Sequence, residues 1–199
     1  MNKILFIVSS IFFLASCQMQ SDYDKMVEKE MAKGIRQDSI FLGMTFGMTA
    51  DSFYEHCKEM NRKGYFFNGP SNRSVQFDIS DQLRHPGKIF FYPTFYEGKI
   101  YEMPASFAYD AFTWNDSYGV DSLMVDVLGL VEEWYGEFKE FKHPEKESVY
   151  VNVNANRRIR VYKNRNDNSV NAVFTDLSID KEELEKAAQS PAEPSNKET

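Results

Sequence analysis

The sequence predicts an α+β fold: a single antiparallel sheet of about six strands, built from two αβββ halves, with its helices packed on one face. First, a segment with apolar residues at helical spacing occurs twice, and each time three segments of alternating apolar and polar residues follow. Second, short turns separate those segments, which favours antiparallel pairing. Third, two amphipathic helices need an apolar sheet face to cover. The halves are residues from about 40–112 and 118–178, and they share the order of elements rather than residue identity.

The first half begins with a predicted helix over residues 50–63. Its apolar residues recur at steps of four and three, which places them on one face: Phe53, Cys57 and Met60. Alternation then predicts strands at 74–80, 88–96 and 99–110. Pro93 and Pro104 lack an N–H group, so we expect a strand edge, a bulge or a break at each.

The second half begins with a predicted helix over residues 120–136, which carries a broad apolar stripe. Alternation around Val151, Ile159 and Ala172 indicates three further strands, and Asn164–Asn168 is a polar hairpin turn between the last two. Beyond this half, a capping box predicts a C-terminal helix over 179–189. The Pro, Ser and charged residues of 190–199 predict a disordered tail.

Residues 1–16 have the composition of a secretory signal peptide. Lys3 supplies a positive start, residues 4–15 are almost wholly apolar, and small residues precede Cys17. The apolar run is too short to cross a bilayer as a helix, which takes about 20 residues. Leu14-Ala15-Ser16-Cys17 resembles the lipobox of bacterial lipoproteins, which implies cleavage before Cys17 and a lipid on its thiol. An ordinary secretory signal that ends in a chance cysteine is the alternative.

This resemblance also implies a location. Several acyl chains on Cys17 would hold the protein firmly on a membrane without spanning it. Gln18 stands where retained inner-membrane lipoproteins carry aspartate, so we expect the outer membrane, on its periplasmic side or at the cell surface. Residues 17–39 then form a lipidated tether. Within it, Tyr23, Met26, Val27 and Met31 have the spacing of a short amphipathic helix, which either docks on the domain or acts as a spacer.

The composition argues against some partners. Lys3 is the only charge in residues 1–16, so the remainder has 22 basic and 30 acidic residues and a net charge of −8. No basic stripe is present, and nucleic acid is therefore not an expected partner. Once Cys17 is lipidated, Cys57 is the only cysteine left, so no internal disulfide can form. The core must be stabilised by packing.

No catalytic motif, metal-binding motif or cofactor-binding loop is apparent, so we expect no cofactor and no metal. His56 is adjacent to Cys57 on the first helix, and adjacent helical residues point about 100° apart, which makes them poor co-ligands. His85 and His143 each precede a proline in a predicted loop. An enzyme would need a histidine brought to an exposed Cys57, whereas its place on the apolar helix face predicts burial.

The segment 88–96 is the most suggestive candidate for an interaction surface. Phe90, Tyr92 and Tyr96 alternate with apolar residues that would face the helices. If helices cover one sheet face only, these three aromatic residues lie on the other face, and exposed aromatic groups often mark binding surfaces. A central strand covered on both sides, or shielded by the tether helix, is the alternative.

Two stretches resemble themes of uncharacterised bacterial envelope lipoproteins. Residues 41–70 contain two glycines four residues apart, a helix with a Phe and a Lys-Gly-aromatic end, and residues 129–138 close a helix with Tyr-Gly. Gly47-Met48-Thr49 is similar to the opening of BamE-type lipoproteins, and the tandem layout resembles β-lactamase-inhibitor-protein-like domains. The resemblance covers about 40–177 and implies a fold, since its motifs are glycines, caps and core aromatics.

Together these observations favour a non-catalytic binding module, anchored by its lipid at the cell envelope, with an envelope protein or a glycan as partner. A more specific alternative is an immunity or inhibitor lipoprotein that blocks a toxin or a hydrolase, as the acidic charge and the inhibitor-like layout suggest. An enzyme of unknown class is the least favoured alternative.

Overall fold

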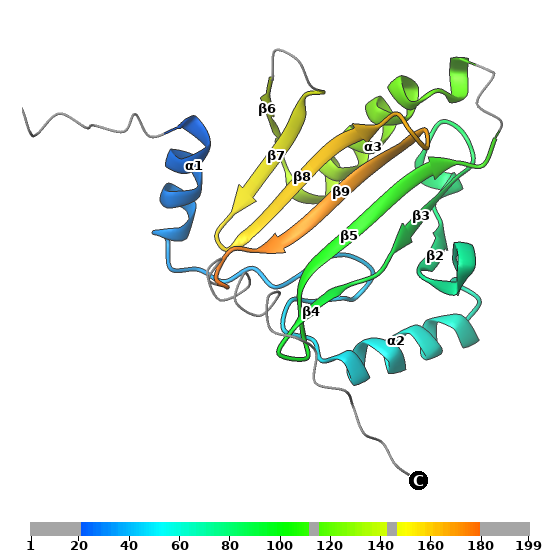
Figure 1. The fold of residues 1–199 in the computed structure, drawn as a ribbon, viewed down its shortest axis with the longest axis horizontal. Helices are drawn as coiled ribbons and strands as arrows, with labels where there is room; N and C mark the ends of the chain where they lie inside the picture. Colours follow the sequence, from blue (N-terminus) through cyan, green and yellow to red (C-terminus); the bar gives the residue numbers. More distant parts are fainter. Residues whose placement is uncertain (1–20, 112–115, 143–146, 180–199) are drawn as a thin grey trace, which may run out of the picture.

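The structure, a computed structural model, describes residues 21–111, 116–142 and 147–179 and has the predicted α+β class (Figure 1). The described helices are α1 (Asp22–Met31), α2 (Ala50–Arg62) and α3 (Val120–Tyr135). The described strands are β1 (Phe66–Asn68), β2 (Val75–Asp78), β3 (Gly87–Phe91), β4 (Thr94–Tyr96), β5 (Lys99–Tyr109), β6 (Lys139–Phe141), β7 (Val149–Asn154), β8 (Arg157–Asn164) and β9 (Ser169–Asp176).

All nine strands belong to one antiparallel sheet in the order β1-β2-β3-β5-β9-β8-β7-β6, with β4 paired to β5 as a hairpin. Each half therefore contributes its own run of neighbouring strands, and β5 and β9 join the two runs at the centre. The sheet is larger than the predicted six strands. The strands β1 and β6 were not predicted because they have three residues each, too few to show alternation. The third additional strand, β4, is the end of the predicted strand 88–96, which the structure divides in two.

The two prolines lie where β5 changes partners. The predicted strand 88–96 is interrupted after Phe91, and Pro93 lies in the break between β3 and β4. On β5, pairing with β4 ends at Glu102 and pairing with β3 begins at Ala105, so Pro104 lies in the gap between the two. Such an interruption tolerates a residue without an N–H group, as expected from the sequence.

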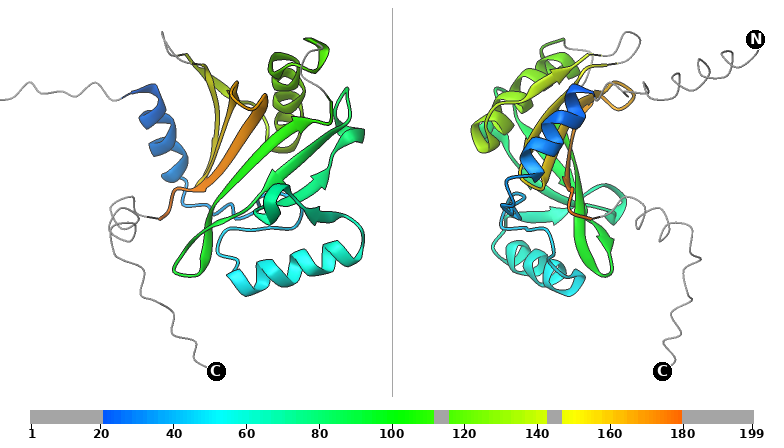
Figure 2. Two further views of the ribbon diagram at one scale, coloured as in Figure 1. Left: turned by 45° about the vertical axis from the view of Figure 1, so that its right-hand side comes forward. Right: turned by 90° about the vertical axis from the view of Figure 1, so that its left-hand side faces the viewer.

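One face of the sheet carries the main core. The register aligns Phe91, Ala105, Ala172 and Val161 across four strands, and all four are buried. The helix α3 lies over β5, β8 and β9, with Leu123, Val127 and Val131 fully buried. The two opposed alanines leave room for it at the sheet centre. The helix α2 adds Phe53 to the same core, and the right-hand view of Figure 2 places both helices on one side of the strands.

The tether helix α1 packs on the opposite face, against β7. Its half-buried residues are Tyr23, Met26, Val27 and Glu30, whereas Met31 is exposed. The predicted stripe was therefore wrong at its last member: Glu30 takes that place because its carboxylate accepts from the backbone N–H of Ala155, at 3.3 Å. Beneath α1, Val151 and Val153 are buried outside the main core. The helices of the two halves thus share one face, and the tether helix docks on the other.

Residues 36–49 connect the tether to both halves. Arg36 forms an ion pair with Asp176 at 2.8 Å, and Arg157 donates to the carbonyl oxygen of Ser39 at 2.8 Å. Burial pushes the pKa of Asp176 upward, but hydrogen bonds from Ser178 and Asn156 and the charge of Arg36 outweigh it, so this pKa lies below its ordinary value. Gly47, at φ 78°, donates its N–H to Ile100 on β5. The described part of the tether is therefore fixed to the domain.

Several predictions fall on residues outside the described ranges: the signal segment 1–16, Cys17, the C-terminal helix 179–189 beyond its first residue, the tail 190–199, and His143. Within the described ranges, no helix has the length and apolar character needed to span a membrane. The predicted helices at 50–63 and 120–136 and the turn at 164–168 are confirmed.

Phe174 on β9 provides a test of the core. Its ring lies 5.1 Å from that of Phe41 and 5.4 Å from that of Tyr135, so it joins the tether end, the sheet and α3. Because Phe174 is fully buried, we expect Phe174→Ala to lower the free energy of unfolding by about 3–5 kcal/mol. Denaturant titration measures the change. Val125→Ala, on the exposed side of α3, should change stability by less than about 0.5 kcal/mol; equal effects of the two variants would contradict this account.

Candidate interaction face

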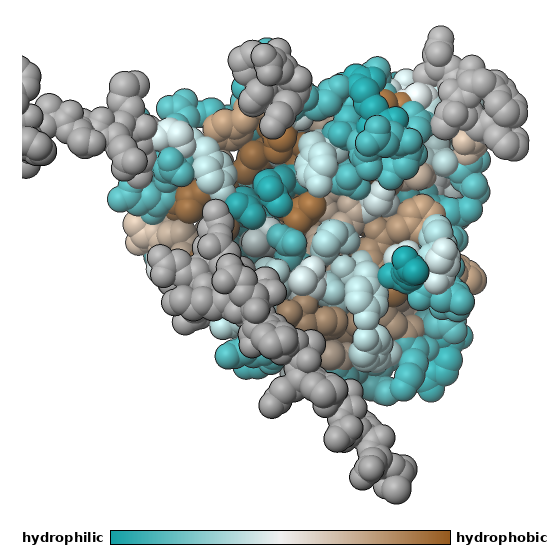
Figure 3. All heavy atoms as spheres, viewed as in Figure 1, coloured by the Kyte–Doolittle hydropathy of each residue, from teal (hydrophilic) through white to brown (hydrophobic). Residues whose placement is uncertain are grey.

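The sheet side that α2 and α3 leave uncovered is the candidate site, and we call its part over β3, β5, β9 and β8 the open face. The register places three rows of side chains there. They are Phe90, Ser106, Asn171 and Tyr162; then Pro104, Val173 and Arg160; and then Glu102, Thr175 and Arg158. Figure 3 looks onto this face, where brown and pale side chains gather over the middle of the sheet. The helix α1 lies over the neighbouring β7, and α2 reaches the margin of this side through the contact of Tyr54 with Tyr92.

Two hollows of about 360 Å³ each flank Phe90, which is half-buried between them. The first hollow extends from Phe90 and Tyr92 across the sheet centre to the second half of the chain. Its remaining lining includes Pro104, Ser106, Tyr162, Asn171 and Val173. The second hollow lies toward the loop after β1 and is more polar, with Asn68, Gln76 and the ion pair between Lys88 and Asp110 at 2.8 Å.

Tyr92 is held at the rim of the first hollow by α2. Its hydroxyl lies 2.6 Å from that of Tyr54 in a hydrogen bond, and its ring packs against Phe53 at 5.8 Å. The hydrogen bond with Tyr54, together with partial burial, raises the pKa of Tyr92 to about 12. Tyr92 is nevertheless 40% exposed. The ring therefore combines a fixed position with an accessible surface.

Of the three aromatic residues predicted from the sequence, the structure brings two together. Phe90 and Tyr92 line the same hollow, whereas Tyr96 lies on β4 beside Tyr101, with ring centroids 6.4 Å apart. Sequence reasoning missed Tyr162 and Asn171, which come from the other half. Their signal was the alternation of polar residues along β8 and β9, but only the pairing of β5 with β9 shows that they face Phe90.

Polar contacts link α1 to the edge of the open face. Arg158 donates to the hydroxyl of Tyr23 at 2.9 Å and to that of Thr175 at 3.1 Å. Thr175 in turn donates to the carboxylate of Glu102 at 3.0 Å. This chain of contacts crosses three strands, so it fixes both the tether helix and the Arg158 side chain.

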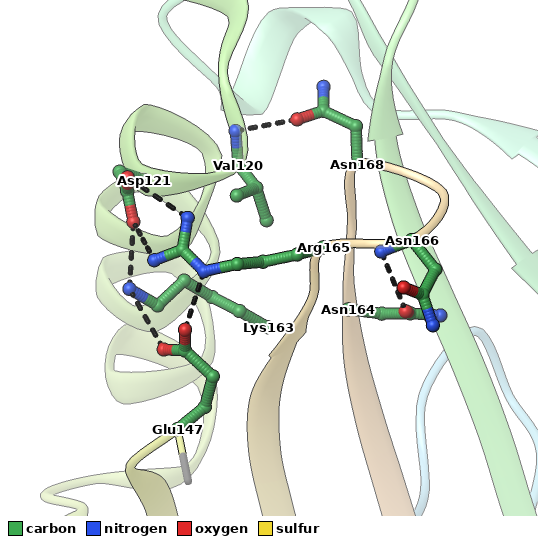
Figure 4. A network of polar contacts seen from close by, with 8 residues as sticks. All are labelled: Val120, Asp121, Glu147, Lys163, Asn164, Arg165, Asn166 and Asn168. Atoms are coloured by element: carbon green, nitrogen blue, oxygen red, sulfur yellow. Dashed lines mark hydrogen bonds and ion pairs between the residues drawn. The ribbon is translucent and has the colours of Figure 1, made fainter. Parts of the chain in front are cut away.

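A separate ion-pair network lies at the hairpin between β8 and β9 (Figure 4). Lys163 and Arg165 both contact Asp121 at the start of α3 and also Glu147, so two cations face two carboxylates. The side chain of Asn168 accepts from the N–H of Val120 at 2.9 Å and so caps α3. The charges here balance one another, which makes this network a link between hairpin and helix rather than a ligand site.

A further hollow of about 400 Å³ opens on the helix-covered side. It is mostly apolar and lies between the first half and the end of α3, with Phe41, Phe77, Ile79, Ile89, Trp134 and Tyr135 in its lining. The hydroxyl of Tyr135 donates to the carbonyl oxygen of Ile40 at its margin.

The residues considered for chemistry have separate surroundings. Nε2 of His56 donates to the carbonyl oxygen of Leu42 at 2.8 Å, and its ring packs on Phe66. His85 stacks with Tyr118, with ring centroids 4.4 Å apart. Cys57 is a free, half-buried thiol whose pKa is raised by burial to about 11. Across residues 21–111, 116–142 and 147–179, no three His, Cys, Asp or Glu side chains gather in a way that could hold a metal ion.

Comparisons with protein-family models, curated proteins and solved structures found no match to this chain.

The raised pKa of Cys57 predicts that its thiol reacts slowly with thiol reagents. At pH 8 a thiol with a pKa of about 11 is about a hundredfold less ionised than one with a pKa near 9, and the thiolate is the reactive form. We therefore expect Ellman's reagent to label Cys57 about a hundredfold more slowly in the folded chain than in denaturant. Cys57→Ser supplies the background rate. Fast labelling of the folded chain would contradict the burial of Cys57 and would favour the hypothesis of a cysteine-dependent enzyme.

Proposed function

We propose that this protein is a lipid-anchored envelope lipoprotein that acts as a non-catalytic binding module, and that a protein partner occupies its open face. The observation that carries the binding role is the open face itself: two hollows flank the half-buried Phe90, and Tyr92, which is 40% exposed, lies at the rim of one of them. The apolar face of a sheet normally packs against another layer, so an uncovered one is a candidate for packing against a partner. Aromatic groups contribute much of the binding energy at protein interfaces.

The anchoring role rests on the N-terminal sequence and on the placement of α1. Four peptide steps separate Cys17 from Ser21, the cap of α1, and can span at most about 14 Å. Because α1 is packed on β7, a lipid on Cys17 would hold the whole domain close to the membrane rather than on a long, free tether. A membrane-proximal envelope protein is therefore the expected kind of partner.

A second candidate is an immunity or inhibitor lipoprotein that blocks a toxin or a hydrolase. Its supporting observation is the arrangement of two similar halves side by side, with one continuous uncovered surface across both. This layout resembles that of β-lactamase-inhibitor-protein-like domains. The two candidates differ in the identity of the partner, which photo-crosslinking in cells can identify.

The anchor is tested by Cys17→Ala. The native chain should incorporate radiolabelled palmitate and sediment with membranes, whereas Cys17→Ala should lose the label and most of its membrane association, since the lipid would be attached to the Cys17 thiol. Cys57→Ala is the matched control and should retain both. Label that persists in Cys17→Ala, or a native chain without label, would refute the lipoprotein assignment.

The open face is tested by photo-crosslinking in cells. A photoreactive phenylalanine analogue at position 90 should give a discrete crosslinked product, because Phe90 lies between the two hollows. The same analogue at position 65 is the control, since Tyr65 is 54% exposed but lines neither hollow. Mass spectrometry of the product identifies a resident envelope protein or, for the inhibitor candidate, a toxin or hydrolase. Equal products from the two positions, or none from position 90, would contradict the proposal.

A further inference from the structure

We infer that the partner is a protein segment that places a carboxylate against Arg160 and an apolar side chain in the first hollow, which Phe90 and Tyr162 line. This inference rests on the binding role proposed above and specifies the chemistry of the partner. Among the described residues, the Arg160 guanidinium on β8 has no ion-pair partner.

Arg160 lies on β8 and faces the open face. Its register partners are Val173 on β9 and Val151 on β7, so apolar residues flank it on both sides. The side chain is half-buried. Its Nε atom is buried without a hydrogen-bond partner, and no ion pair with a described residue involves its guanidinium. A half-buried guanidinium loses part of its hydration free energy, and no ion pair with a described residue compensates for this loss.

The other cations of the same region have partners. Lys88 pairs with Asp110, and Lys163 pairs with Asp121. Arg158, two residues before Arg160 on the same face, donates to Tyr23 and Thr175, and Thr175 connects it to Glu102. The whole chain carries a net charge of −7, so carboxylates are abundant. Arg160 is therefore the position on this face where a carboxylate of a partner can form an ion pair.

An arginine in this setting selects its ligand by geometry. The guanidinium presents donors in a planar fork that matches a carboxylate, and flanking valines lower the local dielectric, which strengthens the pair. Tyr162 follows on the same face of β8 and, with Asn171 and Val173, begins the lining of the first hollow. The Arg160 side chain thus lies next to the first hollow, because its register partner Val173 lines that hollow.

The size of the combined surface indicates a protein segment. From β8 to β3 there are three strand spacings, about 14 Å in all. A small inorganic anion would use Arg160 and leave the hollow unfilled. A nucleic acid would require several unpaired cations along its backbone. A peptide segment with an acidic residue and an apolar residue reaches both ends, and Arg and Tyr are the residues enriched at the energetic centres of protein interfaces.

The test uses a phage-displayed library of random 12-residue peptides, selected on the full chain purified from membranes in mild detergent. Bound peptides are then measured on Arg160→Gln and Phe90→Ala. Arg62→Gln removes the same charge at the exposed end of α2, and Tyr65→Ala removes an exposed ring away from the hollows; these are the matched controls. Thermal unfolding of each variant verifies that it remains folded.

We expect the selected peptides to combine Asp or Glu with an aromatic or aliphatic residue. Their affinity should fall at least tenfold with Arg160→Gln and with Phe90→Ala, and should stay within about twofold with either control. Replacing Asp and Glu in the peptides by Asn and Gln should weaken binding to the native chain to a similar extent.

Three results would overturn the inference. Peptides without acidic residues that need Phe90 but not Arg160 would leave the binding role intact and remove the charge recognition. Peptides that need Arg160 but not Phe90, and that an excess of inorganic phosphate releases, would indicate a general anion site. Selection of no peptide that depends on either residue would contradict the binding role as well.

Discussion

The pairing of β5 with β9 joins the two halves of the chain into one sheet. Six residue pairs, from Glu102–Thr175 to Phe107–Val170, join two runs of strands that are each continuous in sequence. Without this pairing each half would expose an unpaired strand edge and an apolar sheet face too small to be covered well. With it, α3 covers strands of both halves, and Phe174, Phe41 and Tyr135 form one core across the junction.

The same pairing creates two unlike sheet surfaces. Because side chains alternate along every strand, one register aligns Phe91, Ala105 and Ala172 toward the helices and Phe90, Ser106 and Asn171 away from them. The second surface is covered by α1 over β7, and residues of β3, β5 and β9 line a hollow in it. The proposed binding surface is thus a consequence of how the halves join: Phe90 and Tyr92 come from the first half, and Arg160 and Tyr162 come from the second.

Local patterns in the sequence were sufficient for the longer helices and strands but not for the site. The helices α2 and α3 have strong 3.6-residue periodicity, and the long strands alternate clearly, so the α+β class follows from them. The strands β1 and β6 are too short to carry such a pattern. The helix α1 uses Glu30 rather than Met31 because a backbone N–H of the β7–β8 turn lies within reach, which no local pattern reveals. Likewise, the alternation of Arg158, Arg160 and Tyr162 indicates a strand, but the long-range register alone places them opposite Phe90.

If β5 and β9 make the two halves one cooperative unit, native-state hydrogen exchange should detect it. We expect amides paired between β5 and β9 to be among the slowest to exchange and to open only with global unfolding, and we expect β3 and β8 to open at the same free energy. Short outer strands such as β1 and β6 should exchange faster. If instead one half retained its protection while the other exchanged through a separate opening of much lower free energy, the halves would be independent. The open face would then not be a single preformed surface.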